Sequence, residues 1–319
     1  MPLTIAHLIN HPVPPKLNSG GSNRSVTWLA EAQAKAGNNV IVCSPEGRST
    51  DFFTHIELAN EASPETLNDI LPSGVDIIHL HEGFPAIAEA TQQLNRPFIQ
   101  TIRNNAALAS PGQLARNAVY LSEAHMKLHN GRRFVYNGIP INQYKYGPKK
   151  QDFLLFLAKV KRSKKGVQTA IQVASKLGEK LVIAGGYRLG SPASWVPFWP
   201  GVDSVGPVAG ERKLDLLAQT KALLVPIRWD EPFGLTVAEA FASGTPVIAM
   251  RRGAMPELIN DGQTGFLCDS PEDMMAAIKR LNEISPAACR REAEARFSIE
   301  RVALDYGDLY KEIMSGATW

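Results

Sequence analysis

Residues 221–250, KALLVPIRWDEPFGLTVAEAFASGTPVIAM, contain the pattern that decides the fold. The apolar run KALLVPI is followed by a short polar loop, a helical stretch from Thr236 to Ser243 and a second apolar run, TPVIAM. Gly244 is suited to end the helix, because glycine readily adopts the left-handed conformation that follows helix C-termini. This order predicts two buried parallel strands joined by a crossover helix.

The same alternation continues on both sides of this stretch. Before it come the apolar runs LTIAHLI, NNVIVCS, VDIIHLH and RPFIQTI, with an amphipathic segment at residues 24–36. Nearer to it, DFLLFLAKV and KLVIAGG alternate with helical segments near residues 168–177 and 212–219. We therefore predict an α/β protein built from two Rossmann-like, doubly wound domains.

The domain boundary is predicted from a break in this rhythm. Residues 140–152, PINQYKYGPKKQD, are rich in proline, lysine and polar residues and show no clear period, which is typical of a linker. The predicted domains are residues 1–147 and 148–297, and residues 298–319 contain a separate amphipathic helix. Pro286 is expected to interrupt the helical tail that precedes it. Two doubly wound domains leave a cleft between them, where we expect the active site.

Composition narrows the class of protein. The 319 residues are 44% hydrophobic and 20% charged, with a net charge of +3 and basic residues scattered among acidic ones. This is typical of a folded enzyme and argues against nucleic acid as a partner. The three cysteines, Cys43, Cys268 and Cys289, lie far apart, which favours a reducing compartment. The first residues do not resemble a signal peptide, so we expect a cytoplasmic protein, with attachment to a membrane surface left open.

Two carboxylates in the opening stretch are candidate ligand-binding groups. Glu231 lies in the loop and Glu239 lies eight residues later, inside the helix, so the two can accept hydrogen bonds from different hydroxyls of one ligand. The backbone amides of Gly234, Leu235 and Thr236, at the helix N-terminus, form a potential anion site. The alternative interpretation is a solvated loop carboxylate and an ordinary helix glutamate.

The sequence EPFGLTVAEAFASGTPVIA, residues 231–249, resembles the E-x7-E signature of the fourth family of retaining glycosyltransferases. Residues 253–267, GAMPELINDGQTGFL, are also typical of that family. The resemblance implies a GT-B fold and transfer of a sugar from a nucleotide-diphosphate sugar to a hydroxyl acceptor, with no metal or other cofactor. It further implies that Glu231 contacts the donor sugar and Glu239 the ribose.

Residues 157–174, LAKVKRSKKGVQTAIQVA, resemble the family segment that supplies an arginine and a lysine to the donor diphosphate. Lys165, directly before Gly166, matches the lysine. The arginine position is taken by Lys159 if one residue is inserted in the loop, with Arg162 as the alternative. The departure matters, because lysine does not reproduce the bidentate contacts of arginine. Taken alone, the run is equally typical of a solvated basic turn.

The N-terminal half carries weaker matches. Gly20 and Gly21 resemble the family's glycine loop, which lets the backbone approach donor phosphates or acceptor; the alternative is a flexible turn. The family usually has a histidine over the donor sugar, and His81, at the end of its strand, is the better match. His79, on the same strand face, is predicted to be structural. A metal site at this pair is disfavoured, since the sequence offers no obvious third ligand.

Three further segments complete the resemblance. Residues 202–219 are similar to the segment that lines the nucleotide base, so the backbone near Val208 is a candidate donor contact, as is Phe233 in the signature. VYNGIPINQY resembles the motif that ends the first domain. The final helix resembles the family's terminal helix, which crosses back to the first domain. Residues 101–108, TIRNNAAL, replace a TxHG motif, so the acceptor stays open between a polysaccharide precursor and a small metabolite.

Other functions fit the sequence less well. A dehydrogenase requires G-x-G-x-x-G after an early strand, and AGGYRLG has Tyr187 in place of the second glycine. A GT-B phosphorylase, a nucleotide-sugar epimerase or a catalytically silent nucleotide-sugar binder would share the fold. Retention of Glu231, Glu239 and Lys165 argues against the silent protein. The nucleotide, the sugar and the oligomeric state are not indicated by any residue.

Overall fold

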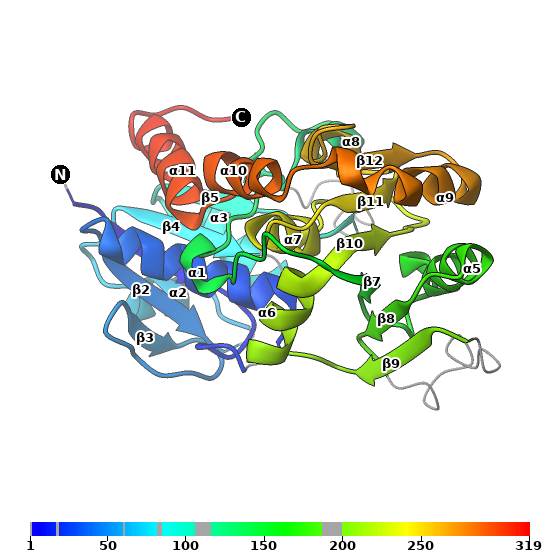
Figure 1. The fold of residues 1–319 in the computed structure, drawn as a ribbon. Coiled ribbons are helices and arrows are strands. Elements are labelled where there is room, and N and C mark those ends of the chain that lie inside the picture. The colour runs from blue at the N-terminus through cyan, green and yellow to red at the C-terminus, as the bar shows by residue number, and fades with distance from the viewer. Residues whose placement is uncertain (1, 17–18, 60, 82–84, 106–115, 187–199) are drawn as a thin grey trace. The chain divides into compact units, whose positions relative to one another are not determined.

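The structure is a computed structural model that describes residues 2–16, 19–59, 61–81, 85–105, 116–186 and 200–319. The chain divides into two compact units. Unit 1 comprises Met1–Ile139 together with Ile299–Trp319, and unit 2 comprises Pro140–Ser298. Among the described residues, each unit contains one six-stranded sheet in which all paired strands are parallel (Figure 1).

The sheet of unit 1 has the strand order β3-β2-β1-β4-β5-β6. Its strands are β1 (Thr4–Leu8), β2 (Asn39–Ser44), β3 (Thr54–Glu57), β4 (Ile77–His81), β5 (Phe98–Thr101) and β6 (Ala118–Val119). This is the order of a Rossmann sheet, in which the winding direction reverses between β1 and β4. Ligands of such sheets bind at the carboxyl ends of the strands at this switch point.

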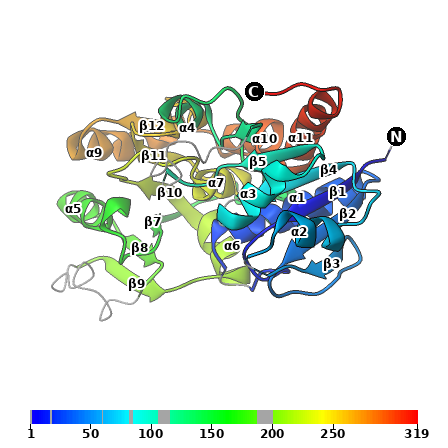
Figure 2. The ribbon, with the colours of Figure 1, turned by 180° about the vertical axis from the view of Figure 1, so that it is seen from behind.

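Helices cover both faces of this sheet, as Figures 1 and 2 show. The helices of unit 1 are α1 (Gly21–Lys35), α2 (Pro64–Ile70), α3 (Pro85–Gln93), α4 (Glu123–Leu128) and α11 (Ile299–Met314). Alternate strand residues point to opposite faces. Ile77 therefore packs with α1 and α11, whereas Ile78 packs with α2 and α3. The helix at the end of the chain thus belongs to the core of the N-terminal sheet.

Unit 2 repeats this architecture. Its strands are β7 (Gln151–Leu157), β8 (Leu181–Ala184), β9 (Val202–Gly206), β10 (Thr220–Val225), β11 (Val247–Met250) and β12 (Gly265–Cys268). Their order, β12-β11-β10-β7-β8-β9, is again that of a Rossmann sheet, with the switch point between β7 and β10. The helices are α5 (Val167–Leu177), α6 (Gly210–Gln219), α7 (Leu235–Ala242), α8 (Met255–Leu258), α9 (Pro271–Lys279) and α10 (Pro286–Arg296).

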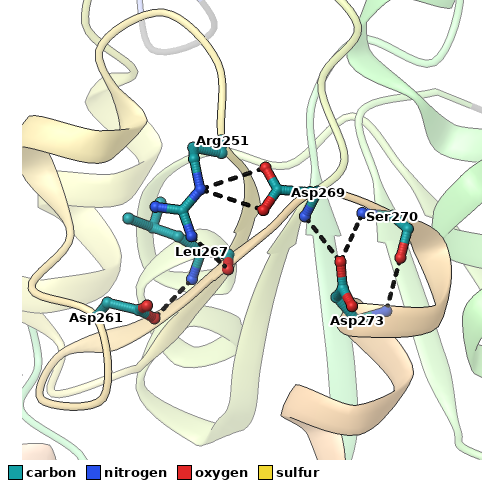
Figure 3. A network of polar contacts seen from close by, with 6 residues as sticks. All are labelled: Arg251, Asp261, Leu267, Asp269, Ser270 and Asp273. Atoms are coloured by element: carbon teal, nitrogen blue, oxygen red, sulfur yellow. Dashed lines mark hydrogen bonds and ion pairs between the residues drawn. The ribbon is translucent and has the colours of Figure 1, made fainter.

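The connection from β12 to α9 shows how local chemistry fixes a helix start (Figure 3). The Ser270 hydroxyl accepts a hydrogen bond from the Asp273 amide at 3.1 Å, and the Asp273 carboxylate accepts one from the Ser270 amide at 2.9 Å. This reciprocal capping box satisfies amides that the helix itself leaves unpaired. Beside it, Arg251 donates to the Asp269 carboxylate and the Leu267 carbonyl.

The predicted fold class is confirmed by these two doubly wound parallel sheets. The helical tail is interrupted at Pro286, as predicted: α9 ends at Lys279 and Pro286 starts α10, because a helix tolerates proline at its first position, where no intrahelical hydrogen bond is lost. One local detail differs from the sequence analysis. The segment read as a linker contains a 3₁₀ turn at Ile141–Gln143 and reaches the start of β7. Within the described ranges, no helix is both long and apolar enough to cross a membrane.

Candidate functional site

The predicted site residues fall into two clusters, one at the switch point of each unit. In unit 2, Lys159 follows β7 and Glu231 follows β10, the two strands at which the winding reverses. In unit 1, His81 ends β4, which pairs with β1. Both clusters therefore lie where open α/β sheets bind ligands.

Glu231 is held in place by two donors that bind the same carboxylate oxygen. Lys165 forms an ion pair with Oε2, and the indole Nε1–H of Trp229 donates to it at 2.9 Å. The side chains of Glu231 and Lys165 are 14% and 20% exposed, so most of the surface of the pair is withdrawn from solvent. Because both donors approach Oε2, the carboxylate is fixed in orientation with Oε1 directed away from them.

Two glycines allow the backbone around Glu231 to pack closely. A Cβ at Gly253 would lie 2.3 Å from the Glu231 amide nitrogen, and the next residue, Ala254, donates to the Glu231 carbonyl at 3.0 Å. Gly166, directly after Lys165, has φ +77° and approaches the carbonyl of Pro226, where a Cβ would lie 1.8 Å from the oxygen. Only glycine fits at both positions, so these two glycines determine the backbone conformation of the loops that carry Glu231 and Lys165.

Glu239 lies deeper, in α7, and is fully buried. Its Oε1 accepts hydrogen bonds from the Lys213 ammonium at 2.6 Å and from the Tyr144 hydroxyl at 2.9 Å. Lys213 comes from α6, and Tyr144 follows the short 3₁₀ turn before β7. A buried carboxylate is costly unless it is paired, and here one lysine and one aromatic hydroxyl stabilise its charge.

The two candidates for the second phosphate ligand lie in the turn after β7. The Arg162 amide donates to the Lys159 carbonyl at 3.0 Å, and the Lys165 amide donates to the Arg162 carbonyl at 2.9 Å. The side chains of Lys159 and Arg162 are both exposed. Both candidates therefore lie at the carboxyl end of β7.

The start of α7 has no side-chain cap. Gly234 precedes the helix in the left-handed conformation, with φ +96°, and the half-buried Leu235 and Thr236 form the first turn. Phe233 is 2% exposed and packs edge-to-face on Phe297, so its side chain belongs to the core and only its backbone can contact a ligand.

The remaining predicted donor contacts are backbone positions in loops or at a helix start. The half-buried Val208 lies between β9 and α6. Gly20 precedes α1 with φ −61°, a conformation open to any residue, and Gly21 is the first residue of that helix. Among the described residues, none has an atom within 4 Å of the position that a Cβ at Gly20 would take.

Three histidines meet at the switch point of unit 1. His7 in β1 is the register partner of His79 in β4, and His81 lies two residues further on the same face. The rings of His79 and His81 are stacked at 4.0 Å between centroids, and all three side chains have no exposed surface. His7 Nδ1 lies 2.9 Å from His81 Nε2. The sequence offered no obvious third ligand beside His79 and His81, and the structure supplies one, because adjacent strands bring His7 beside the pair.

The three histidines belong to a network of polar contacts. Its first part runs from the residues after β5 to α1. Arg103, two residues after β5, lies with its guanidinium nitrogen 2.9 Å from His81 Nδ1 and donates to the Asn137 side-chain oxygen at 3.2 Å. His81 contacts His7, as described above, and the other ring nitrogen of His7, Nε2, lies 2.7 Å from the side-chain oxygen of Gln33 in α1.

The second part runs from α1 through α11 back to the sheet. The Gln33 side-chain amide donates to the Tyr310 hydroxyl at 3.0 Å, and that hydroxyl lies 2.7 Å from His79 Nδ1. His79 Nε2 lies 2.7 Å from the Thr101 hydroxyl, which lies 2.8 Å from the Tyr306 hydroxyl. We call these eight residues the histidine chain: Arg103, His81, His7, Gln33, Tyr310, His79, Thr101 and Tyr306.

Burial keeps the three imidazoles neutral. Burial lowers the pKa of His7 from 6.5 to about 4. The hydrogen bond to Gln33 raises this pKa, and the positive charge of Arg103 lowers it further. Burial, followed by the neighbouring histidine and Arg103, holds the pKa values of His79 and His81 well below 6.5. Desolvation also raises the pKa values of Tyr306 and Tyr310 above 10. All five groups are therefore uncharged near neutral pH.

Sequence reasoning missed several residues that complete these clusters. Trp229 stands two positions before Glu231, Tyr144 lies in the segment VYNGIPINQY, and Lys213 lies within residues 202–219. No spacing rule connects them to a carboxylate, because the contacts are made across loops. His7 was detectable, since the Rossmann strand order places the first strand beside the fourth.

A family model described as "Glycosyl transferases group 1" matches residues 140–296. This part of the chain is therefore similar to glycosyl transferases of group 1. Curated relatives support this. A D-inositol 3-phosphate glycosyltransferase of a Nocardioides species is 35% identical over 119 residues, and a glycogen synthase of Mycobacterium tuberculosis is 39% identical over 93 residues. The alignments cover 35% and 28% of this chain but 26% and 22% of the relatives, so they span about a quarter of the relatives' length.

Solved structures resemble the whole chain in fold. The chain and the glycosyltransferase AviGT4 of avilamycin A biosynthesis align over 100% of both chains with a TM-score of 0.81 and 24% identity. Anabaena HepE, in a structure with UDP and glucose, aligns over 97% of this chain and 100% of its own with a TM-score of 0.73 and 16% identity. The predicted GT-B architecture is thereby confirmed, and the transferase class is supported by the group 1 domain and its relatives.

Proposed function

We propose that this protein is a retaining glycosyltransferase that moves a sugar from a nucleotide-diphosphate donor to a hydroxyl acceptor. The observation that carries the proposal is the pair Glu231 and Glu239 in a group 1 domain, each oriented by one lysine and one aromatic donor. Two fixed acceptors at different depths suit hydroxyls at the two ends of a nucleotide sugar, with Glu231 on the sugar and Glu239 on the ribose.

The leaving group is a diphosphate, which needs positive charge and hydrogen-bond donors as it departs. Lys165, together with Lys159 or Arg162, supplies positive charge at the end of β7, and the uncapped amides at the start of α7 supply donors. Lys165 would then serve both the diphosphate and Glu231. The acceptor hydroxyl would attack from the face of the leaving group, whose phosphate takes the acceptor proton.

The first donor to test is a UDP-sugar, because HepE was crystallised with UDP and glucose. UDP-, GDP- and ADP-sugars, each with its free nucleotide diphosphate, are scored by thermal shift and by nucleotide release. For the wild type, a donor at one hundred times its Kd stabilises the folded protein by about 2.7 kcal/mol. The sugar form should stabilise more than the free diphosphate.

Two variants separate the roles. Glu231→Gln should bind the free diphosphate like the wild type but lose the additional stabilisation from the sugar. Glu239→Gln should lose stabilisation by both ligands. The control is Glu179→Gln, since Glu179 also forms an ion pair with a lysine, Lys221, but lies outside the motif. If no nucleotide sugar or diphosphate shifts the wild type, or if Glu179→Gln behaves like Glu231→Gln, the proposal is wrong.

A further inference from the structure

The histidine chain can be assigned a direction, because each of its members can donate or accept only in certain combinations. A neutral imidazole has one N–H donor and one lone-pair nitrogen, so it passes a hydrogen bond on in a single direction. A hydroxyl can donate to one neighbour while accepting from another, and a primary amide presents a donor on one side and an acceptor on the other. Because a flip of the Gln33 side-chain amide exchanges its oxygen and nitrogen, two opposite directions would satisfy the three imidazoles, Gln33 and Tyr310 equally.

Arg103 removes this ambiguity. A guanidinium has five N–H donors and no acceptor, so the contact with His81 is a hydrogen bond donated to Nδ1. The proton of His81 must then be on Nε2, which donates to His7 Nδ1 at 2.9 Å. His7 in turn carries its proton on Nε2 and donates to the Gln33 oxygen at 2.7 Å.

The direction continues through α11. With its oxygen engaged by His7, Gln33 donates through its nitrogen to the Tyr310 hydroxyl, which is then free to donate to His79 Nδ1 at 2.7 Å. His79 therefore carries its proton on Nε2 and donates to Thr101. The reverse direction would put all three protons on Nδ1, and the proton of His81 would face the donors of Arg103.

We propose that the histidine chain is a unidirectional hydrogen-bond chain in which Arg103 sets the direction and His7, His79 and His81 are all Nε2–H tautomers. Arg103, Gln33 and Tyr310 are positioning residues for His81. With each ring nitrogen of His81 engaged, the imidazole is held neutral in one orientation at the end of β4. The tautomers do not depend on the function proposed above.

A metal ion at the three histidines is the competing assignment, since a nitrogen from each ring lies within 4.8 Å of the others. The contacts favour the hydrogen-bond chain. Both ring nitrogens of each histidine lie within 2.9 Å of a partner in the chain, so a bound metal would have to displace at least one hydrogen bond per ring. The rings and their partners are at most 3% exposed, apart from Arg103, which is half-buried.

Nitrogen NMR of the protein labelled with ¹⁵N-histidine tests the assignment, because a protonated ring nitrogen and a lone-pair nitrogen have well-separated chemical shifts. In the wild type at pH 7, His7, His79 and His81 should each show Nε2–H and a lone pair on Nδ1. An Nδ1–H tautomer at His81 would overturn the proposal. So would displacement of all three ring signals by one equivalent of Zn²⁺, which would identify the cluster as a metal site.

Substitutions at Arg103 test its role in setting the direction. Glutamine can accept as well as donate, so Arg103→Gln should give a second set of signals with Nδ1–H at His81 and His7. Lysine has only donors, so Arg103→Lys should restore the single tautomer. Arg96→Gln is the control, since Arg96 donates to the backbone carbonyls of Pro72 and Val75. Identical spectra for Arg103→Gln and the wild type would overturn the proposal. If Arg103→Gln does not fold, the tautomers measured in the wild type decide whether the proposal holds.

Discussion

The two switch-point clusters bury polar groups in different ways. In unit 2, Glu231 and Glu239 are each bound by a lysine and by the N–H or O–H of an aromatic side chain. In unit 1, three imidazoles are buried as neutral groups, and hydrogen bonds connect them in series. Paired charges can attract a polar ligand, whereas a chain of neutral donors and acceptors mainly fixes orientation.

The difference predicts that the two units respond differently to acid. All seven histidines of the sequence lie in residues 1–139, which belong to unit 1. Burial lowers the pKa values of His7, His79 and His81 in the folded state, so between those values and 6.5 the unfolded chain binds more protons. The free energy of unfolding of unit 1 therefore decreases as the pH falls from 6.5 towards 4.

The largest expected effect is this loss of stability. Each of the three histidines should lower the free energy of unfolding by about 1.4 kcal/mol for each pH unit below 6.5. His7→Gln should remove one such contribution, so that its unfolding free energy depends less steeply on pH than that of the wild type. The measurement is urea unfolding at pH 7, 6 and 5.

Native thiols report on each unit separately. Cys43 is buried in unit 1, and Cys268 and Cys289 are buried in unit 2. Burial raises the pKa of each thiol to about 12, so labelling requires unfolding. Between pH 7 and pH 5, the urea midpoint for labelling of Cys43 by a reagent active in acid should fall while the other two stay constant. Equal shifts at all three thiols, or equal slopes for His7→Gln and wild type, would contradict the comparison.

The second prediction concerns the charged cluster and depends on the proposed transferase activity. Trp229→Phe keeps a ring beside Lys164, whose ammonium lies 3.3 Å from the ring centroid, but removes the hydrogen bond to Glu231. A hydrogen bond to a charged group contributes about 1.5–3 kcal/mol. We expect kcat for nucleotide release to fall at least about tenfold with little change in KM, because the carboxylate loses its fixed orientation.

The matched control is Trp319→Phe. Its indole Nε1–H also donates a single hydrogen bond, to the Ala118 carbonyl at 2.9 Å in unit 1. It should retain wild-type kcat, since the same substitution is made outside the charged cluster. Equal losses in the two variants would mean that Trp229 acts on folding and not on Glu231.

The sequence predicted the regular part of the molecule well because local patterns determine it. The stretch 221–250 gave a strand, a helix and a strand, and the structure has β10, α7 and β11 there. Period-two alternation placed His79 and His81 on one face, where they are found. The interruption of the helical tail at Pro286 was also predicted, since proline is disfavoured inside a helix and favoured at its first position.

The partners of the site residues were beyond the reach of local patterns. Tyr144 and Lys213 reach Glu239 from positions 95 and 26 residues away in sequence, and Tyr310 lies 231 residues from His79. Such contacts depend on how the sheet and helices pack, which no spacing of residue types encodes. A motif can therefore identify a carboxylate or a histidine, while the group that orients it is visible only in the fold.

The smallest expected effect tests whether the two units unfold separately, on which the comparison depends. Ser270 caps α9 in unit 2 and Ser63 caps α2 in unit 1, and each is followed by proline at the first helical position. Replacing either by alanine should cost about 1 kcal/mol, since a helix N-terminal amide loses its acceptor. Ser270→Ala should lower the urea midpoint for labelling of Cys268 and leave Cys43 unchanged, and Ser63→Ala should do the opposite. If either variant shifts both thiols equally, the units unfold as one, and acid weakening of the histidine chain would then weaken the charged cluster as well.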